Sequence, residues 1–219
     1  MAGRTIAVGD IHGCDVALEV VLAQLELAAG DTLVVLGDVV DRGPNTRRAI
    51  EQLIDVQRKC KLIFIMGNHE EMMLDALAEG EWSEGWLRYG GDATLESYGG
   101  DSVKIPSAHR EFLQTGLDYW ETDREIFIHA NLEPGVALHA QHPEWLRWTH
   151  LTGNERPHPS GKTVICGHTP QSGTWPIAYS GWIAIDTHAY GGRWLTALDV
   201  DTLEVWQGNQ AGESRRGQL

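Results

Sequence analysis

The sequence predicts an α/β domain with several parallel strands, and three observations in its first third carry this prediction. Three apolar runs, each the length of one strand, are followed by short glycine-containing turns. Each turn is followed by a stretch with helical periodicity. Strand, turn and helix repeated in this order place the three turns at one edge of a sheet, outside the carboxyl ends of its strands. The expected strands are residues 5–8, 32–36 and 62–66.

The helices expected after these turns have apolar faces. The first covers residues 15–27 and the second residues 46–58, where Asn45 is placed to cap the N-terminus. The third begins at Glu70, directly after the third turn. The apolar stripes of the first two helices are Leu18, Val21, Leu22 and Leu25, and Ala49, Ile50, Leu53 and Ile54.

The rest of the chain predicts further strands of the same domain. Residues from about 79 to 119 divide into short helical pieces and glycine turns, which indicates an insertion packed over the edge of the sheet. A single domain is expected over residues 1–207, followed by a flexible polar tail over residues 208–219. The later strands are expected at 125–128, 163–166, 182–185, 194–198 and 203–207.

Composition limits the classes of partner. The formal net charge of −14 disfavours nucleic acid or an anionic membrane as a partner. Three cysteines without a CxxC pair do not suggest a disulfide framework, so a reducing cytoplasm is expected. The first strand starts almost at Met1, which leaves no room for a signal peptide, and no apolar run approaches membrane-spanning length. Composition does not set the oligomeric state, and a monomer is the default expectation.

The turns carry oxygen and imidazole ligands of the kind that divalent metals prefer. Two later strands also end in histidine, so five strand ends bring such ligands to one edge of the sheet. Core or capping roles for these histidines are disfavoured because all five motifs agree. We expect two ions ~3.5–4 Å apart that share one carboxylate and lower the pKa of a shared water, so that hydroxide is available near neutral pH. The expected ligands are Asp10, His12 and Asp38 for the first ion, and Asp38, Asn68, His129 and His168 for the second.

Five motifs resemble those of a known enzyme family: GDIHG at 9–13, GDVVDRG at 37–43, GNHE at 67–70, HAN at 129–131 and GHTP at 167–170. On these motifs the chain resembles the metal-dependent phosphoprotein phosphatases of the calcineurin-like metallophosphoesterase superfamily, in particular the small bacterial and phage serine/threonine phosphatases. The resemblance covers nearly the whole chain. It implies two mixed β-sheets packed face to face with helices outside and the metals at one end. It also implies Mn²⁺ as the expected ion, although Fe, Zn or Co suit the same ligands.

The resemblance further implies hydrolysis of phosphoserine or phosphothreonine in a phosphoprotein substrate, with metal-bound hydroxide attacking phosphorus. His69 would protonate the departing alkoxide, and Asp41 would hold its imidazole charged and oriented. Arg42 would clamp the phosphate with its planar set of donors. A buried structural ion pair is the alternative for Asp41 and Arg42. Glu70 and Glu71 are expected to serve the helix N-terminus, where negative charge is favoured.

Two positions depart from the family pattern. His150 stands where relatives often carry a second phosphate-binding arginine. Either His150 binds phosphate when protonated, or Arg147 or Arg156 substitutes, or phosphate binding is simply weaker. His188 stands where relatives usually have glycine, and it either supports the metal ligands or faces solvent.

Other function classes share some of these motifs. In symmetrical dinucleoside tetraphosphate hydrolases the second motif usually lacks the aspartate found here at Asp41, and the third often ends in Asp instead of Glu70. Both residues therefore favour the protein phosphatase. A phosphodiesterase is disfavoured by the string Asp41-Arg42-Gly43, and a catalytically silent binding module by the intact ligand set. Broad activity on small phosphoesters is a further alternative.

Overall fold

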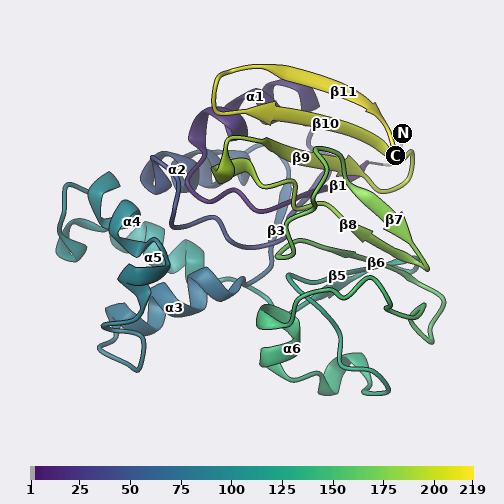
Figure 1. Ribbon diagram of the computed structural model, residues 1–219. Coiled ribbons are helices and arrows are strands. Elements are labelled where there is room, and N and C mark those ends of the chain that lie inside the picture. The colour runs from purple at the N-terminus through teal and green to yellow at the C-terminus, as the bar shows by residue number, and fades with distance from the viewer. Residues whose placement is uncertain (1–2) are drawn as a thin grey trace.

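The computed structural model of the protein describes residues 3–219 and contains two mixed β-sheets packed face to face, with helices outside (Figure 1). The six-stranded sheet has the spatial order β11 (Ser214–Gln218), β10 (Glu204–Asn209), β9 (Trp194–Asp199), β1 (Thr5–Val8), β2 (Thr32–Val35) and β3 (Lys61–Phe64). The five-stranded sheet has the order β4 (Trp120–Glu121), β5 (Glu125–Phe127), β6 (Thr163–Cys166), β8 (Trp182–Ala184) and β7 (Ile177–Tyr179). This is the fold that the motifs implied.

Each sheet has a parallel centre, as the strand–turn–helix order predicted. β1, β2 and β3 run parallel, with Thr5 opposite Thr32 and Thr32 opposite Lys61. β5, β6 and β8 run parallel in the second sheet. The facing sides of the sheets share one apolar core that includes Val34, Phe127 and Ile165. This core fixes the two sheets against each other, and the carboxyl ends of the parallel strands provide the loops that build the site.

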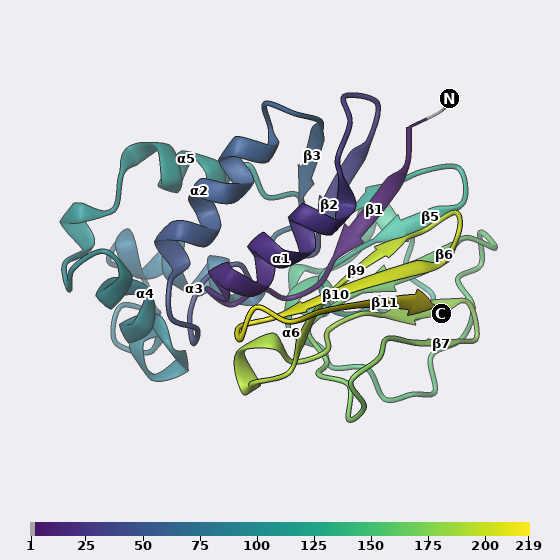
Figure 2. The same cartoon turned by 90° about the horizontal axis from the view of Figure 1, so that it is seen from above.

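Helices α1 (Asp15–Leu25) and α2 (Thr46–Val56) cover the outer side of the six-stranded sheet (Figure 2). Their buried residues join those of β1 and β2 in a second core, which also holds Trp206 of β10. The predicted N-cap of α2 is confirmed, because the Asn45 side chain accepts a hydrogen bond of 3.2 Å from the backbone N–H of Arg48. α3 (Asn68–Leu77) begins at Asn68, two residues before the predicted start, so that the GNHE motif forms its first turn.

The segment from 79 to 119 is helical and packs mainly against α2 and α3, beside the edge strand β3 (Figure 2). A parallel bridge between Ile65 and Leu117 returns it to the sheet. Its elements are a 3₁₀ turn at Trp86–Tyr89, α4 (Gly91–Ser97), a 3₁₀ turn at Ser102–Lys104 and α5 (Ser107–Gln114). After β5 follow a 3₁₀ turn at Leu138–Ala140 and α6 (Pro143–Trp148), and a last 3₁₀ turn covers Ala189–Gly191.

The prediction of a flexible tail over residues 208–219 is wrong. These residues complete β10 and form β11, the antiparallel edge strand of the six-stranded sheet. A tight turn joins the two strands, in which the Asn209 side chain accepts hydrogen bonds from the N–H groups of Ala211 and Glu213. Arg215 then packs over the ring of Trp194, with the guanidinium 4.1 Å from the ring centroid. Backbone pairing with β10 and the stacking of Arg215 on Trp194 therefore hold β11 in place. Its residues are polar, so no apolar periodicity in the sequence predicts this strand.

Two further findings concern the chain as a whole. Among residues 3–219, none of the helices has the length and apolar content needed to cross a membrane. The three cysteines are unpaired and buried. Burial raises the pKa of the Cys14 thiol to about 12, so this residue beside the first motif is a packing residue and not a nucleophile.

Candidate metal centre

The motifs meet at the carboxyl ends of the parallel strands and are bonded to one another through the backbone. The N–H groups of Ile11 and His12 both donate to the carbonyl of Asp38, at 3.0 and 2.7 Å. Gly37 allows the close approach of the neighbouring segments, because a Cβ there would lie 2.7 Å from the Gly67 nitrogen and 2.9 Å from Nδ1 of His129. The turns after β1, β2 and β3 therefore pack closely against one another and against His129, which follows β5.

Backbone strain is concentrated in this cluster. Several non-glycine residues have a positive φ, between 45° and 72°, a region that L-residues rarely adopt. Such conformations persist only where the surrounding structure holds them, and they cluster at functional sites. Among the predicted site residues, those with positive φ are His12, Asp38, Asp41, Arg42 and His168.

Three histidines use one ring nitrogen to bond a backbone carbonyl and turn the other toward the centre. This arrangement fixes the tautomer and leaves a lone pair for a metal ion, as is usual for metal-binding histidines. All three have their pKa lowered, first by burial, which favours the neutral imidazole that binds metal. The anchoring bonds are His12 Nδ1 to Val40 O (2.9 Å), His129 Nδ1 to Leu36 O (2.7 Å) and His168 Nε2 to Trp148 O (3.1 Å).

The Asp38 carboxylate lies between two groups of ligand atoms. Its Oδ2 is 3.4 Å from Nε2 of His12, and its Oδ1 is 3.4 Å from Nε2 of His129. Nε2 of His129 is also 3.1 Å from Oδ1 of Asn68 and 3.2 Å from Nδ1 of His168. Each oxygen of Asp38 therefore faces a different set of ligands, which is the geometry that a bridging carboxylate requires. The donor set fits two divalent cations.

Asp10 lies beside the two ligand groups around Asp38 and is not one of their closely spaced members. Its carboxylate accepts hydrogen bonds of 3.1 Å from the backbone N–H of His168. Burial, together with the charges of Asp186 and Asp38, raises the pKa of Asp10 well above its usual range. Burial likewise raises the pKa of Asp186 to about 7. Clustered buried carboxylates of this kind are stabilised by a bound cation.

Asp186 is a residue that the sequence analysis did not assign to the site. It is buried, is the second residue after β8, and accepts a hydrogen bond of 2.9 Å from the backbone N–H of His188. Its position at a strand end, inside the string Ile185-Asp186-Thr187, was the signal that could have identified it.

Glu70 organises the second motif, and so does more than the predicted role at a helix N-terminus. Its buried carboxylate accepts hydrogen bonds from the N–H of Gly67, at the start of α3, and from three successive N–H groups of the turn that carries Asp38. The distances are 3.1 Å to Gly67 and 2.8, 2.7 and 3.1 Å to Asp38, Val39 and Val40. Glu71 instead accepts a hydrogen bond of 3.1 Å from Nε1 of Trp148.

His69 and Asp41 form a buried pair next to the first ligand group. Nδ1 of His69 is 2.8 Å from Oδ2 of Asp41. Burial lowers the pKa of His69, but the charges of Asp38 and Asp41 more than offset it, so the net shift is upward. The other nitrogen, Nε2, is buried and has no hydrogen-bond partner in residues 3–219. The upward shift favours the protonated imidazole, and the unpartnered Nε2 lies in the part of the site that holds His12 and Asp38.

Two residues of the helical insertion hold Asp41 in place, and neither was predicted. Nε1 of Trp86 donates to the Asp41 carboxylate at 2.9 Å, and the hydroxyl of Thr94 donates to Oδ1 at 2.8 Å. The insertion thus contributes to the site, although its sequence shows only short helices and glycine turns.

Arg42 is exposed at the same edge. Its Nη1 is 3.0 Å from Nε2 of His12, and its guanidinium packs 4.7 Å over the ring of Tyr190. Asp41 pairs with His69 instead of Arg42, so the alternative of a buried Asp41–Arg42 ion pair is wrong.

The structure separates the candidates for the second phosphate ligand. Arg147 is held in ion pairs with Glu71, at 3.3 Å, and with Asp118, so both of its Nη atoms are engaged, and its buried Nε has no hydrogen-bond partner in residues 3–219. His150 is exposed and its ring stacks on that of His168, with centroids 4.4 Å apart. Arg156 instead lines a neighbouring cavity.

His188 is partly buried and packs against Tyr190. The two ring centroids are 4.5 Å apart. Its backbone N–H also donates a hydrogen bond to Asp186, so His188 contacts residues next to the ligand groups.

Comparison with known proteins defines the class of the chain. Residues 3–174 match the calcineurin-like phosphoesterase family, and the chain belongs to this family. It is therefore a metallophosphoesterase, a hydrolase of phosphoesters, and the ligand groups described above are candidates for a dinuclear metal centre.

Individual relatives differ in substrate. Serine/threonine-protein phosphatase 2 of Salmonella typhimurium is 29% identical over 202 residues, which are 84% of this chain and 86% of that protein. Serine/threonine-protein phosphatase 1 of the same organism is 41% identical over 86 residues, but these are only 39% of this chain and 38% of that protein. The symmetrical bis(5'-nucleosyl)-tetraphosphatase of Acidovorax ebreus is 40% identical over 70 residues, 32% of this chain and 24% of that protein.

The fold is shared with solved structures. The crystal structure of a suspected diadenosine tetraphosphatase matches with a TM-score of 0.72 at 22% identity, over 99% of this chain and 94% of that one. The crystal structure of a cold-active protein-tyrosine phosphatase from a psychrophilic Shewanella matches with a TM-score of 0.68 at 16% identity, over 100% and 81%. At these identities the likeness concerns the fold alone.

Proposed function

We propose that the protein is a serine/threonine phosphoprotein phosphatase that hydrolyses phosphomonoesters. The observation that carries the proposal is the buried His69–Asp41 pair with its unpartnered Nε2. An alkoxide is a poor leaving group and needs a proton as it departs. A nucleotide leaving group, in contrast, is already stable as an anion and does not need one. The general acid therefore favours phosphoserine or phosphothreonine over a dinucleoside polyphosphate.

The proposal includes two divalent cations, with Mn²⁺ as the expected ion and Fe, Zn or Co as alternatives for the same mixed ligands. Asp10, His12 and Asp38 would hold one, and Asp38, Asn68, His129 and His168 the other. When bound, such a pair lowers the pKa of water and neutralises charge on the phosphoryl oxygens. Asp186 lies close enough to Asp10 to add to the negative field that attracts the first cation.

The protein's own side chains would complete the reaction. Arg42 binds a phosphate oxygen with its planar donors, and Tyr190 beneath it limits where the guanidinium can lie. Nε2–H of His69 donates its proton to the ester oxygen of serine or threonine as that oxygen leaves. Asp41 stabilises the imidazolium before the transfer, and Trp86 and Thr94 keep Asp41 in position. His150 is the remaining candidate for a second contact with phosphate.

A symmetrical dinucleoside tetraphosphate hydrolase is the second candidate, because a relative with that name matches 32% of the chain. Two residues argue against it: Asp41, which charges His69, and Glu70, whose length lets it reach three N–H groups of the neighbouring turn. A monomer in the cytoplasm that acts on a phosphoprotein, without nucleic acid or membrane as a partner, completes the proposal.

A parallel assay tests the proposal. The Mn²⁺-loaded enzyme is given a phosphoserine peptide, a symmetrical dinucleoside tetraphosphate and the bis-ester bis-p-nitrophenyl phosphate under the same conditions. We expect the highest kcat/KM on the phosphopeptide. A higher value on the tetraphosphate would overturn the proposal in favour of the second candidate, and a higher value on the bis-ester would indicate a phosphodiesterase.

A further inference from the structure

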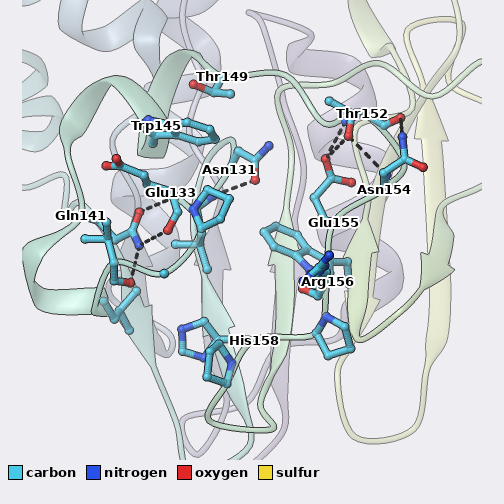
Figure 3. A pocket seen from close by; sticks show the side chains of 18 of the residues that line it. Asn131, Glu133, Gln141, Trp145, Thr149, Thr152, Asn154, Glu155, Arg156 and His158 are labelled. Atoms are coloured by element: carbon cyan, nitrogen blue, oxygen red, sulfur yellow. Dashed lines mark hydrogen bonds between the residues drawn. The ribbon is translucent and has the colours of Figure 1, made fainter.

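A cavity of about 860 Å³ lies against β8 of the five-stranded sheet, and Figure 3 shows the side chains that line it. Its walls come from the segment after β5, from α6 and from the loop that precedes β6. Of the residues that line it, the catalytic proposal uses His150 alone. The volume lies within the range of protein sites that bind small molecules or side chains, about 300–1,000 Å³.

The cavity is continuous with the catalytic site. His150 lines it, and the ring of His150 stacks on His168, one of the expected metal ligands, with centroids 4.4 Å apart. Asn131 lines it as well, two residues after the ligand His129. A group that extends from a phosphate bound at the metals can therefore reach this cavity past His150.

The lining is largely apolar. Trp145 of α6 and Trp182 of β8 face it, together with Leu132, Val136 and Leu138. Three prolines add further apolar surface. The indole N–H of Trp182 donates to the carbonyl of Arg156 at 2.9 Å, so this ring presents carbon atoms and no free donor.

The amide and carboxylate side chains in the walls are already bonded within the protein (Figure 3). Gln141 bonds the backbone of Glu133 and Val136 with both ends of its amide. Glu155 accepts hydrogen bonds from Thr152, and the amide of Asn131 is engaged by Leu132 and His150. Because these groups are engaged, a hydrocarbon side chain can enter without leaving any of them unpaired, and the exposed guanidinium of Arg156 stays in contact with water.

We infer that this cavity is a specificity subsite that receives a bulky apolar side chain of the substrate polypeptide, close in sequence to the phosphorylated serine or threonine. The inference rests on the proposed phosphoprotein phosphatase activity. It adds the substrate class: phosphopeptides with a large aliphatic or aromatic residue next to the phosphorylated residue are preferred to those with glycine or charged residues there.

A scan of synthetic phosphoserine peptides tests the inference. One phenylalanine is placed at each flanking position in turn within a glycine- and serine-rich peptide, and kcat/KM is measured for each. Burial of a side chain of this size is expected to raise kcat/KM by roughly 10- to 100-fold at one or two positions. p-Nitrophenyl phosphate, which is too short to reach far into the cavity, serves as the reference substrate.

Filling the cavity provides the matched comparison. Ala137, the residue before the 3₁₀ turn Leu138–Ala140, lines it, whereas Ala140 at the end of that turn is also exposed but does not line it. Ala137→Trp should abolish the phenylalanine preference and leave turnover of p-nitrophenyl phosphate unchanged, and Ala140→Trp should behave as the wild type. Asn154→Trp fills the cavity from the opposite wall and gives an independent variant if Ala137→Trp does not fold.

The outcomes separate the inference from the proposed function. Hydrolysis of all phosphopeptides at similar rates, or a preference that persists in both filled variants, would overturn the subsite and leave the phosphatase activity intact. Inert phosphopeptides, with hydrolysis of dinucleoside tetraphosphate that falls in Ala137→Trp, would overturn both and assign the cavity to a nucleoside.

Discussion

Replacing His69 by asparagine tests the assignment of the general acid. His69 is 1% exposed, its Nδ1 is fixed by Asp41 at 2.8 Å, and its Nε2 has no partner. A positioned proton donor contributes typically 10²–10⁴-fold, so kcat on a phosphoserine peptide should fall by roughly two to four orders of magnitude, or about 3–5 kcal/mol. The loss should be much smaller for p-nitrophenyl phosphate, because a stable phenolate needs little protonation.

The assay compares kcat for the two substrates in wild-type and His69→Asn enzymes loaded with Mn²⁺, with metal content measured on the same samples. His139→Asn, at an exposed histidine outside the ligand groups, is the control and should match the wild type. Equal losses on both substrates would show that His69 does not protonate the leaving group. Loss of a metal ion would place it among the ligands, as its closeness to His12 and Asp38 allows.

Three further outcomes follow from the same contacts. Asp41→Asn should show the same dependence on the leaving group at roughly 10- to 100-fold, because it only orients and charges the imidazole; an equal loss on both substrates would contradict this. Glu70→Gln should lower the free energy of unfolding by about 2–4 kcal/mol, since two of the four N–H groups lose their acceptor and face the new NH₂ group, and urea titration against Glu71→Gln measures it. Arg4, together with two backbone N–H groups, lowers the pKa of buried Asp31 to about 2. The stability that this pair adds should therefore be complete above about pH 5 and disappear as the pH falls toward 2. The wild type should exceed Asp31→Asn by about 1–2 kcal/mol at pH 7, a value reduced because Arg4 is partly exposed, and the gap should close at low pH; a gap independent of pH would refute the ion pair.

The sequence predicts well what depends on local pattern. Strands β1 and β6 have the predicted limits, and the three parallel strands with their turns follow from apolar runs and glycines. These are the elements whose ends carry Asp10, Asp38 and His168. Alternation of strand and helix is enough to place such residues at one edge of the sheet. Helical crossovers make successive strands parallel, so the carboxyl ends of these strands lie at the same edge.

What the sequence did not reveal depends on contacts between distant segments. Trp86 and Thr94 belong to an irregular insertion, and only the folded chain brings them to Asp41. Edge strand β11 consists of polar residues, so no apolar alternation identifies it. The roles of Glu70 toward the turn at Asp38, and of Tyr190 beneath Arg42, likewise follow from tertiary packing.

The most direct test of the account is an anomalous difference map from crystals grown with Mn²⁺ and measured near the manganese absorption edge. We expect two peaks ~3.5–4 Å apart, one on each side of the Asp38 carboxylate. One peak should contact Asp10 and His12, and the other Asn68, His129 and His168. A single peak, or two peaks that do not share Asp38, would contradict the dinuclear site on which the proposed phosphatase mechanism depends.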